Sequence, residues 1–333
     1  MFLLAVNLGL AMSRLNADQL AKTEIDVWNS VKGSVVVLLR EGIPSGQAAL
    51  IDKSGLFLAH QDVVFTSTTK GRLADGRMVV LDWKSTDPST QTVLLQAENW
   101  KSDAQPVSLG DPSTTPPSGS VLVVLPAGPV KGQMSSKTQL AVLASRHLFA
   151  LGEVLFEATA QNIGGALVFD RNAHLVGLLN ATLEPVESVG TPKFATPGKP
   201  VAQNSLQRNL QGNGYGPGQM MVGYTVQSDV LRRIVSGFTS PSHRVQHPAI
   251  GIYCKDFPGK GALLYSVRPG SPANKAGLQS GDVILKIDDE IINDQLDFAR
   301  VIETKDVGST IQVTISRNFQ TQTVPVTVGI YQN

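Results

Sequence analysis

Val267–Leu278 reads VRPGSPANKAGL, and shortly after it Gly281–Asp288 reads GDVILKID. The first stretch combines a turn rich in proline and glycine with a short helical segment at Ala273–Ala276. The second contains an apolar, β-branched run at Val283–Ile287, which is typical of a strand. Together they predict a compact unit in which a turn and a short helix precede a strand.

The same unit extends outward over His247–Ile330. A longer helix is predicted at Leu296–Thr304, where apolar residues recur at helical spacing. Four further strands are predicted, two on each side of the central turn: Ile250–Tyr253, Ala262–Val267, Thr310–Arg317 and Thr323–Val328.

This pattern resembles the PDZ domains that follow HtrA proteases, which are small β-barrels with two helices. The resemblance implies that Ala249, Ile250, Gly251 and Ile252 form the loop that binds a peptide's C-terminal carboxylate. Successive backbone N–H groups around Gly251 would form the anion-binding nest, and glycine permits the turn. The peptide would lie as an added strand beside Ile250–Tyr253, against the helix at Leu296–Thr304.

The same resemblance places Ile252, Phe298, Val301 and Ile302 around the pocket for the peptide's last side chain. Phe298 and Val301 are explained equally well as core residues, because any helix in such a unit must bury one face. Since the pocket is apolar, the predicted partners are protein or peptide C-termini with an apolar last residue.

The preceding part of the chain also consists of short strand-like runs separated by turn signals such as Asp75-Gly76. Many strands at this spacing, with no long helix between them, favour an all-β sandwich or barrel. The runs are Ser34–Leu39, Ala48–Ile51, Leu56–Ala59, Met78–Trp83, Thr92–Ala97, Ser120–Leu125, Gln139–Ala144, Ala166–Phe169 and Leu175–Asn180.

Helices are predicted before and after this β-rich region, at Asn16–Lys32 and at Ser228–Val235. The second helix has Ser228 as its N-cap and Gly237 at its end. Glu184–Gln219 is rich in Pro, Gly, Gln, Asn and Ser without apolar periodicity, so we interpret it as an insertion loop. A strand at Met220–Val226 follows this loop.

Three segments of this region carry a recognisable chemistry. Gly55–Val64 reads GLFLAHQDVV, Asp87–Leu94 reads DPSTQTVL, and Gln161–Val168 reads QNIGGALV. In order and spacing they resemble the motifs that hold the catalytic His, Asp and Ser of the HtrA/Deg group of trypsin-like serine proteases. Gly223–Val226 (GYTV) resembles the segment that closes that domain. The resemblance implies a mainly β chain, with a chymotrypsin-like double β-barrel followed by the PDZ domain.

The catalytic positions themselves depart from the family pattern. The base position holds Asp62, the orienting acid is replaced by Gln91, and the nucleophile by Ile163. Acyl transfer in this fold needs a hydroxyl, an imidazole that takes its proton, and an acid that holds the imidazole. Gln161 also replaces the glycine whose backbone N–H belongs to the oxyanion hole. The sequence therefore predicts a pseudoprotease, with no catalytic residues.

Two alternatives remain open: a hydrolase with a non-standard site, and a metal-binding pseudoprotease. His60 precedes Asp62 by two residues, and such a shift moves a side chain by several ångströms, away from position 163. His60 and Asp62 could form half of a metal site, but we expect a solvated loop pair instead.

The other histidines lie elsewhere in the predicted fold. His147 is expected in a helical or turn stretch, His174 on a hairpin, and His243 and His247 in a linker. No metal site and no cofactor are predicted.

Composition narrows the remaining classes. The chain has 333 residues and a net charge of +1, with 28 basic and 27 acidic residues and no evident basic patch, so nucleic-acid binding has little support. The single cysteine, Cys254, excludes an internal disulfide and is expected to be a partly buried structural thiol. Met1–Ser13 (MFLLAVNLGLAMS) resembles the apolar core of a secretory signal without a basic start; an amphipathic N-terminal helix is the alternative. We therefore expect an extracytoplasmic location, periplasmic or secreted.

The predicted organisation follows from these patterns. A scaffold or regulator in protein quality control is expected, with an active protease paralogue as a further partner, and family precedent implies a homotrimer. The predicted segments are an N-terminal or signal segment at 1–15, a protease-fold domain at 16–238 with its insertion at 184–219, a linker at 239–246 and a PDZ domain at 247–333.

Overall fold

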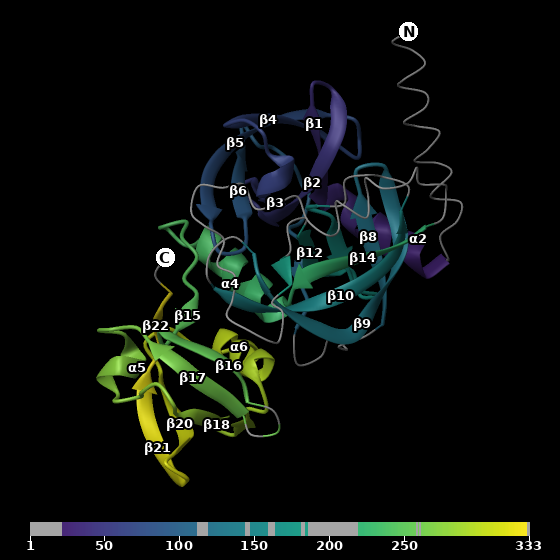
Figure 1. Cartoon of the computed structure of the whole chain (residues 1–333). Coiled ribbons are helices and arrows are strands. Elements are labelled where there is room, and N and C mark those ends of the chain that lie inside the picture. The colour runs from purple at the N-terminus through teal and green to yellow at the C-terminus, as the bar shows by residue number, and fades with distance from the viewer. Residues whose placement is uncertain are drawn as a thin grey trace. The chain divides into compact units, whose positions relative to one another are not determined.

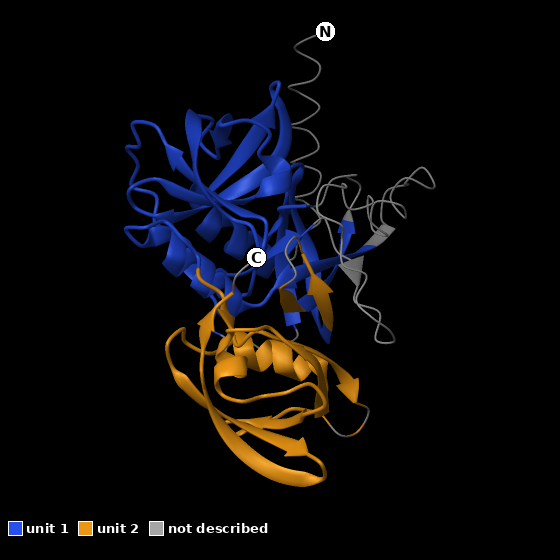
Figure 2. Cartoon of the chain, turned by 60° about the vertical axis from the view of Figure 1, so that its left-hand side comes forward, with its two compact units in different colours: residues 1–138, 151–184, 196–245 blue, residues 139–150, 185–195, 246–333 orange. Residues whose placement is uncertain are grey.

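The computed structural model describes residues 22–111, 119–143, 147–158, 164–180, 184–185, 219–257, 259 and 261–331. Figure 1 shows a chain dominated by strands. It divides into two compact units, shown in Figure 2: unit 1, residues 1–138, 151–184 and 196–245, and unit 2, residues 139–150, 185–195 and 246–333. No helix in the described part of the chain is long and apolar enough to cross a membrane.

A closed six-stranded barrel forms the first half of unit 1. Its strands follow the order β1-β2-β3-β6-β5-β4, and pairing of β1 with β4 closes the ring. Apolar side chains such as Phe57, Leu81 and Leu95 fill its interior. The strands are β1 (Val35–Arg40), β2 (Ile43–Asp52), β3 (Leu56–His60), β4 (Thr68–Leu73), β5 (Met78–Asp87) and β6 (Thr92–Ala97).

A second sheet follows along the chain, in the order β10-β14-β12-β11-β8-β9-β13, with β7 beside β12. An additional pairing joins β10 to β9, so the strands from β10 to β9 in this order form a ring. The ring surrounds a core that includes Val123, Phe156 and Val168. Its strands are β7 (Ser108–Leu109), β8 (Gly119–Leu125), β9 (Gly128–Val142), β10 (Leu148–Ala158), β11 (Leu167–Phe169), β12 (His174–Asn180), β13 (Glu184–Pro185) and β14 (Gln219–Val226).

Short helices complete unit 1: α2 (Lys22–Val31), η1 (Lys32–Ser34), η2 (Gln61–Val63) and α4 (Ser228–Thr239). The caps predicted for the helix at Ser228–Val235, Ser228 and Gly237, are both wrong, because α4 continues through Gly237 and its caps are Gln227 and Ser240. Gly237 serves close packing instead: a Cβ atom there would lie 2.7 Å from the carbonyl oxygen of Arg244. Residues 16–21 of the first predicted helix lie outside the described residues.

Unit 2 has one main sheet, ordered β16-β17-β18-β20-β21, and a separate pair, β15 with β22. Its core contains Phe298, Val301 and Ile315, and the thiol of Cys254 is buried among these apolar side chains, as expected. The elements are β15 (Pro248–Ala249), β16 (Ile252–Phe257), β17 (Gly261–Val267), α5 (Pro272–Lys275), β18 (Val283–Ile287), β19 (Glu290–Ile291), α6 (Gln295–Glu303), β20 (Thr310–Arg317), β21 (Gln320–Thr327) and β22 (Gly329–Ile330).

The predicted fold class is confirmed: the chain is mainly β, with two barrels followed by a small β unit with two helices. Several elements differ from the prediction. β4 and β10 were not expected, β9 begins well before Gln139, and the strand predicted at Ile250–Tyr253 is interrupted at Ile250 and Gly251. Of the insertion predicted at 184–219, the structure describes only residues 184–185 and 219.

Candidate functional site

The first two motif segments of unit 1 meet at the ends of β3 and β6. His60 is paired with Thr92 across these strands, and the backbone N–H of Gln61 donates to the carbonyl oxygen of Gln91 over 2.7 Å. Gln91 has a left-handed backbone, with φ of 57°. The backbone around position 62 therefore lies close in space to position 91. The resemblance of the two segments to protease motifs predicts this closeness.

The turn that leads to Gln91 is shaped by buried polar groups. Asp87 is 2% exposed; its carboxylate accepts from the hydroxyl of Thr90 over 2.5 Å and from the backbone N–H of Ser89 over 3.2 Å. Such local side-chain bonds favour a turn over a continued strand. The acidic residue at the start of this motif is thus used to hold the turn.

The third motif segment reaches the same place. Gln161 and Ile163 lie outside the described residues, but Gly165 follows them closely, and its backbone N–H donates to the carbonyl oxygen of Leu179 over 2.8 Å. A Cβ atom on Gly165 would lie 3.1 Å from both the Cβ of His60 and a methyl group of Val63. All three motif segments therefore converge in unit 1.

His60 does not form the solvated pair with Asp62 that the sequence suggested. Its side chain is fully buried, because β3 ends in the interior of unit 1. Its Nε2 lies 3.1 Å from Nδ2 of Asn180, which also donates to the carbonyl oxygen of Thr90 over 3.1 Å. Nδ1 accepts from the backbone N–H of Asp62, whose carboxylate is 3.7 Å away.

The electrostatics of His60 fit a structural imidazole. Burial lowers its pKa below the usual 6.5, and the nearby Asp62 carboxylate opposes this shift only in part. The neutral ring is the form that the interior favours. Within the described residues, Nδ1 of His60 accepts from the backbone N–H of Asp62, and Nε2 faces the side-chain amide of Asn180.

Unit 2 contains a groove with a volume of about 340 Å³. Of the residues predicted to bind a peptide, six line it: Ala249, Ile250, Gly251, Ile252, Phe298 and Ile302. Val301 is not among the residues that line the groove; it is 1% exposed and packs in the core of unit 2, on the same face of α6 as Phe298 and Ile302. For Phe298, which is 8% exposed, both interpretations hold, since it packs in the core and lines the groove.

The loop between β15 and β16 is fixed by its backbone. Gly251 has φ of 79°, a conformation that favours glycine, and a Cβ atom there would collide with the side chain of Ser271. The carbonyl oxygen of Gly251 accepts from the N–H of Arg268 over 2.8 Å, and that of Ile250 accepts from Ala273 over 2.9 Å. The turn and short helix within Val267–Leu278 thus hold the Gly251 loop in place through these two hydrogen bonds.

The groove lies between an edge strand and a helix. β16 ends the main sheet, so one of its two edges is left for an added strand. α6 stands opposite, and its first residue is tied to β16 because the N–H of Gln295 donates to Asp256 over 2.9 Å. This bond sets the distance between the two walls at one end.

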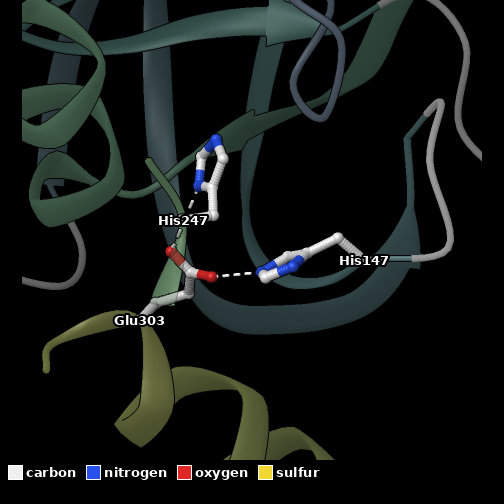
Figure 3. Close-up of side chains that lie close together, drawn as sticks. All are labelled: His147, His247 and Glu303. Carbon is white, nitrogen blue, oxygen red and sulfur yellow. Dashed lines mark hydrogen bonds and ion pairs between the residues drawn. The ribbon is translucent and has the colours of Figure 1, made fainter. Parts of the chain in front are cut away.

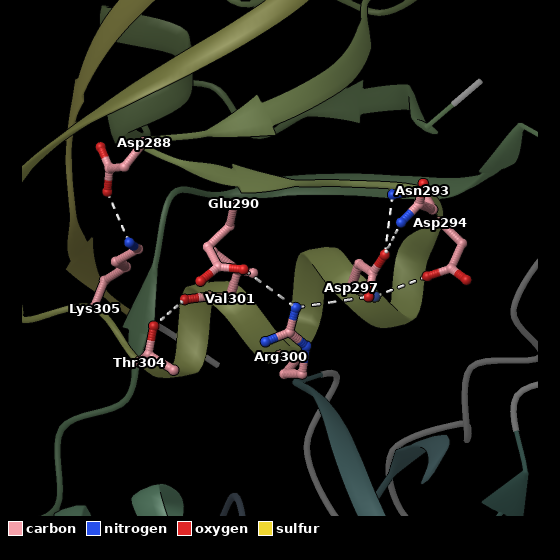
Figure 4. A network of polar contacts seen from close by, with 9 residues as sticks. All are labelled: Asp288, Glu290, Asn293, Asp294, Asp297, Arg300, Val301, Thr304 and Lys305. Atoms are coloured by element: carbon pink, nitrogen blue, oxygen red, sulfur yellow. Dashed lines mark hydrogen bonds and ion pairs between the residues drawn. The ribbon is translucent and has the colours of Figure 1, made fainter. Parts of the chain in front are cut away.

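Polar contacts shown in Figure 4 fix the rest of α6. Asp294 caps its N-terminus by accepting from the N–H of Asp297 over 2.8 Å, while Asp297 accepts from the amide of Asn293 over 2.8 Å. Past the C-terminal end, Lys305 donates to Asp288 over 2.7 Å. Since both ends are anchored, α6 presents Phe298 and Ile302 to the groove in a fixed orientation.

Sequence reasoning missed two basic residues of the groove. Arg268 and Lys275 line it together with Ser271, beside the Gly251 loop. Arg268 precedes the short helix α5 and Lys275 is its last residue, and their position within Val267–Leu278 could have suggested this role. Their charge makes this end of the groove favourable for an anion.

Two further histidines are buried: His147, expected in a helical or turn stretch, and His247, expected in a linker. His147 directly precedes β10, and His247 directly precedes β15; they are 7% and 3% exposed. Both lie against Glu303, the last residue of α6, which is 2% exposed. The residues are far apart in sequence, so no motif spacing could have revealed them.

Cys254 has the properties expected of an inert thiol. Burial, assisted by the nearby Asp256 carboxylate, raises its pKa to about 12. Because the thiolate is the reactive form, this cysteine is not a candidate nucleophile.

Comparisons with known proteins agree with this architecture. Residues 248–328 match the family model of the PDZ domain. The probable periplasmic serine endoprotease DegP-like of Marinomonas sp. is 25% identical over 299 residues, covering 84% of this chain and 57% of the relative. Serine protease PepD of Mycobacterium tuberculosis is 24% identical over 347 residues, covering 93% of this chain and 69% of that protein. The chain thus spans little more than half the length of the first relative.

Solved structures establish the fold further. The HtrA-type protease AlgW with decapeptide superimposes with a TM-score of 0.63 at 16% identity, covering 93% of this chain and 99% of that one. The serine endoprotease from Yersinia pestis gives a TM-score of 0.53 at 16% identity, covering 94% and 100%. At this level of identity the likeness concerns the fold alone.

Proposed function

From the premise that this chain is an HtrA-like serine protease homologue with a PDZ domain, we propose that it binds protein C-termini and cleaves none. The observation that carries the proposal is the groove of unit 2, which combines a glycine loop, an edge strand and an apolar wall. The peptide is held there as an extra strand on β16, the recognition mode typical of PDZ domains.

Each part of the groove has a distinct role in this binding. The terminal carboxylate lies at the Gly251 loop, near the positive charges of Arg268 and Lys275. The last side chain of the peptide contacts Ile252, Phe298 and Ile302, so an apolar residue is preferred. The solved AlgW structure contains a decapeptide, which supports a peptide ligand for this fold.

The absence of cleavage follows from residue chemistry at the matching positions. Ile163 has no heteroatom that could attack a carbonyl, and Gln91 carries no charge that could stabilise an imidazolium. Asp62 cannot activate a nucleophile that is absent. Gln161 replaces the oxyanion-hole glycine, and an oxyanion hole alone keeps only a small part of the rate enhancement. The relatives named above are proteases, so this chain would differ from them in activity.

The binding proposal is tested with a fluorescent peptide that ends in a free, apolar C-terminus. Ile252→Asp places a charge on the apolar wall and is expected to weaken binding at least about tenfold, the equivalent of ~1.4 kcal/mol. The control is Ile291→Asp, at an exposed isoleucine of β19 that does not line the groove. Equal affinity of both variants and the wild type in fluorescence anisotropy would show that the groove is not the peptide-binding site.

The absence of catalysis is tested separately. The purified chain is expected to leave β-casein intact and to remain unlabelled by a fluorophosphonate probe. An active HtrA-type protease, assayed in parallel as the positive control, should cleave β-casein and become labelled. Cleavage that survives the probe but is stopped by a chelator would instead identify a hydrolase with a metal-dependent site.

The remaining assignments belong to the same proposal. The chain is organised as a protease-fold domain at 16–238, a linker at 239–246 and a PDZ domain at 247–333, and it works in an extracytoplasmic compartment. A role as scaffold or regulator of an active protease, and assembly as a trimer, are tested by co-purification and by sedimentation of the full chain. Two relatives carry the name probable periplasmic serine endoprotease DegP-like, which supports this location.

A further inference from the structure

Three buried, metal-ligating side chains meet in unit 2. Figure 3 shows His147, His247 and Glu303, with each imidazole directed at one oxygen of the carboxylate. Their nearest ligand atoms all lie within 4.8 Å of one another. They come from three separate segments: the connection before β10, the residue before β15, and the end of α6.

The geometry around the two imidazoles is fixed. Nε2 of His147 is hydrogen-bonded to Oε1 of Glu303, and Nδ1 of His247 lies 3.7 Å from Oε2. The ring of His147 packs edge-on against Tyr331, with centroids 4.5 Å apart, and Phe149 contacts both imidazoles, at 4.6 and 5.3 Å. Aromatic packing therefore restricts the rotation of both rings, which is a requirement for a preorganised ligand set.

We propose that His147, His247 and Glu303 bind a divalent transition-metal ion, for which zinc is the best match. Two imidazoles and one carboxylate are a common protein donor set for zinc, and imidazole nitrogens disfavour magnesium or calcium. Zinc–ligand distances of about 2 Å place the ligand atoms of a tetrahedral site roughly 3.3 Å apart. Nδ1 of His247 already lies 3.7 Å from Oε2 of Glu303, and the carboxylate would give up its hydrogen bond to His147 to admit the ion. His147 and Glu303 also line the groove, so an ion can reach the site from it.

A metal at this position has a structural consequence. It links the connection between β9 and β10 to β15 and to the helix that forms one wall of the groove. The inference does not depend on peptide binding or on the absence of proteolysis, because it rests on three side chains that neither argument uses.

The experiment uses the full chain, freed of metal by dialysis against a chelator and titrated with Zn²⁺ in a calorimeter. One zinc ion per chain is expected. His147→Asn, His247→Asn and Glu303→Gln should each weaken binding about a hundredfold or more, since even loss of an outer hydrogen bond to a ligand costs 10–100-fold. The control is His174→Asn, at a histidine that is paired with Asp170 outside the cluster.

Two further readouts keep the test decisive if a variant is unstable. Co²⁺ added to the wild type should give the intense visible absorption of a four-coordinate site with nitrogen ligands. Zn²⁺ should raise the Tm of the wild type and of His174→Asn, but not that of Glu303→Gln. A wild type that binds no Zn²⁺ and gives no such Co²⁺ spectrum overturns the proposal, as does full zinc affinity in all three cluster variants.

Discussion

The converging motif segments of unit 1 and the groove of unit 2 use their polar groups in different ways. In unit 1, His60, Asn180, Thr90 and Asp87 are each at most 2% exposed, and their hydrogen bonds connect them to neighbouring backbone and to one another. In unit 2, Gly251, Ile252, Arg268 and Lys275 line an open groove. A buried and hydrogen-bonded histidine beside a motif position is therefore not by itself evidence of catalysis; access to a ligand is the better indication of function.

Unit 2 itself also contains both kinds of polar group: some stabilise its fold, and others line the groove. Asp282 is 1% exposed, and its carboxylate accepts from Nε and Nη2 of Arg317 over 2.6 and 2.7 Å, and from the N–H of Gln279 over 2.8 Å. This ion pair joins β20 to the turn before β18, and neither residue lines the groove. It belongs to the framework that holds the binding surface.

Arg317→Met has the largest predicted effect. It leaves a buried carboxylate without its cation, which costs about 3 kcal/mol of the free energy of unfolding. All three tryptophans, Trp28, Trp83 and Trp100, belong to unit 1, so tryptophan fluorescence follows unit 1 and circular dichroism follows both units. In urea, the circular dichroism transition of unit 2 should move to lower urea while the fluorescence transition stays in place.

The matched control is Lys286→Met, which breaks an exposed pair with Asp289 and should change stability by less than about 0.5 kcal/mol. An equal shift of the fluorescence transition in Arg317→Met would show that the two units unfold together, and the comparison between them would lose its basis.

Asn180→Ala has the next largest effect, now in unit 1. The substitution removes the amide that contacts Nε2 of His60 and the carbonyl oxygen of Thr90. Leaving such buried groups without this partner costs about 1–3 kcal/mol. The fluorescence transition should therefore move to lower urea, and peptide affinity should be unchanged. Asn29→Ala, at an exposed side chain that accepts from Nζ of Lys32, serves as the control and should leave both values unchanged.

The smallest predicted effect concerns pH. Because burial lowers the pKa of His60 below 6.5, the folded chain holds fewer protons on this ring than the unfolded chain at pH values just below 6.5. The contribution of the neutral His60 ring to the unfolding free energy of unit 1 is then fully present above pH 6.5. It is lost as the pH falls below this value. His60→Gln removes this titration, so its unfolding free energy should depend less on pH in that range. A slope unchanged by His60→Gln would contradict a neutral buried ring.

Much of the fold was predictable because its signals are local. The strands Thr92–Ala97, Val283–Ile287 and Thr310–Arg317 were predicted with the bounds that the structure has. β10 was not, because LFALGEVLFEA contains mainly Leu, Ala, Phe and Glu and only one β-branched residue, so its composition does not separate strand from helix. Gly237 is in a helix because of tertiary packing against Arg244, which no local pattern shows.

The candidate sites were predictable to different extents. The groove followed from a contiguous motif, since Gly251 and its neighbours are next to one another in sequence, although the core position of Val301 depends on the rotation of α6. The burial of His60 was missed because the apolar run ends at Ala59, while the strand continues one residue further inside. The cluster of His147, His247 and Glu303 forms only through long-range contacts and has no sequence signature.

The account depends most directly on what happens to a peptide in the groove of unit 2. The decisive measurement incubates the full chain with a peptide that ends in a free apolar residue, follows saturable binding, and then weighs the recovered peptide by mass spectrometry. We expect saturable binding, an intact peptide, and at least about tenfold weaker binding of the same peptide with an amidated C-terminus. Cleaved peptide, or equal affinity for the free and amidated forms, would contradict the account.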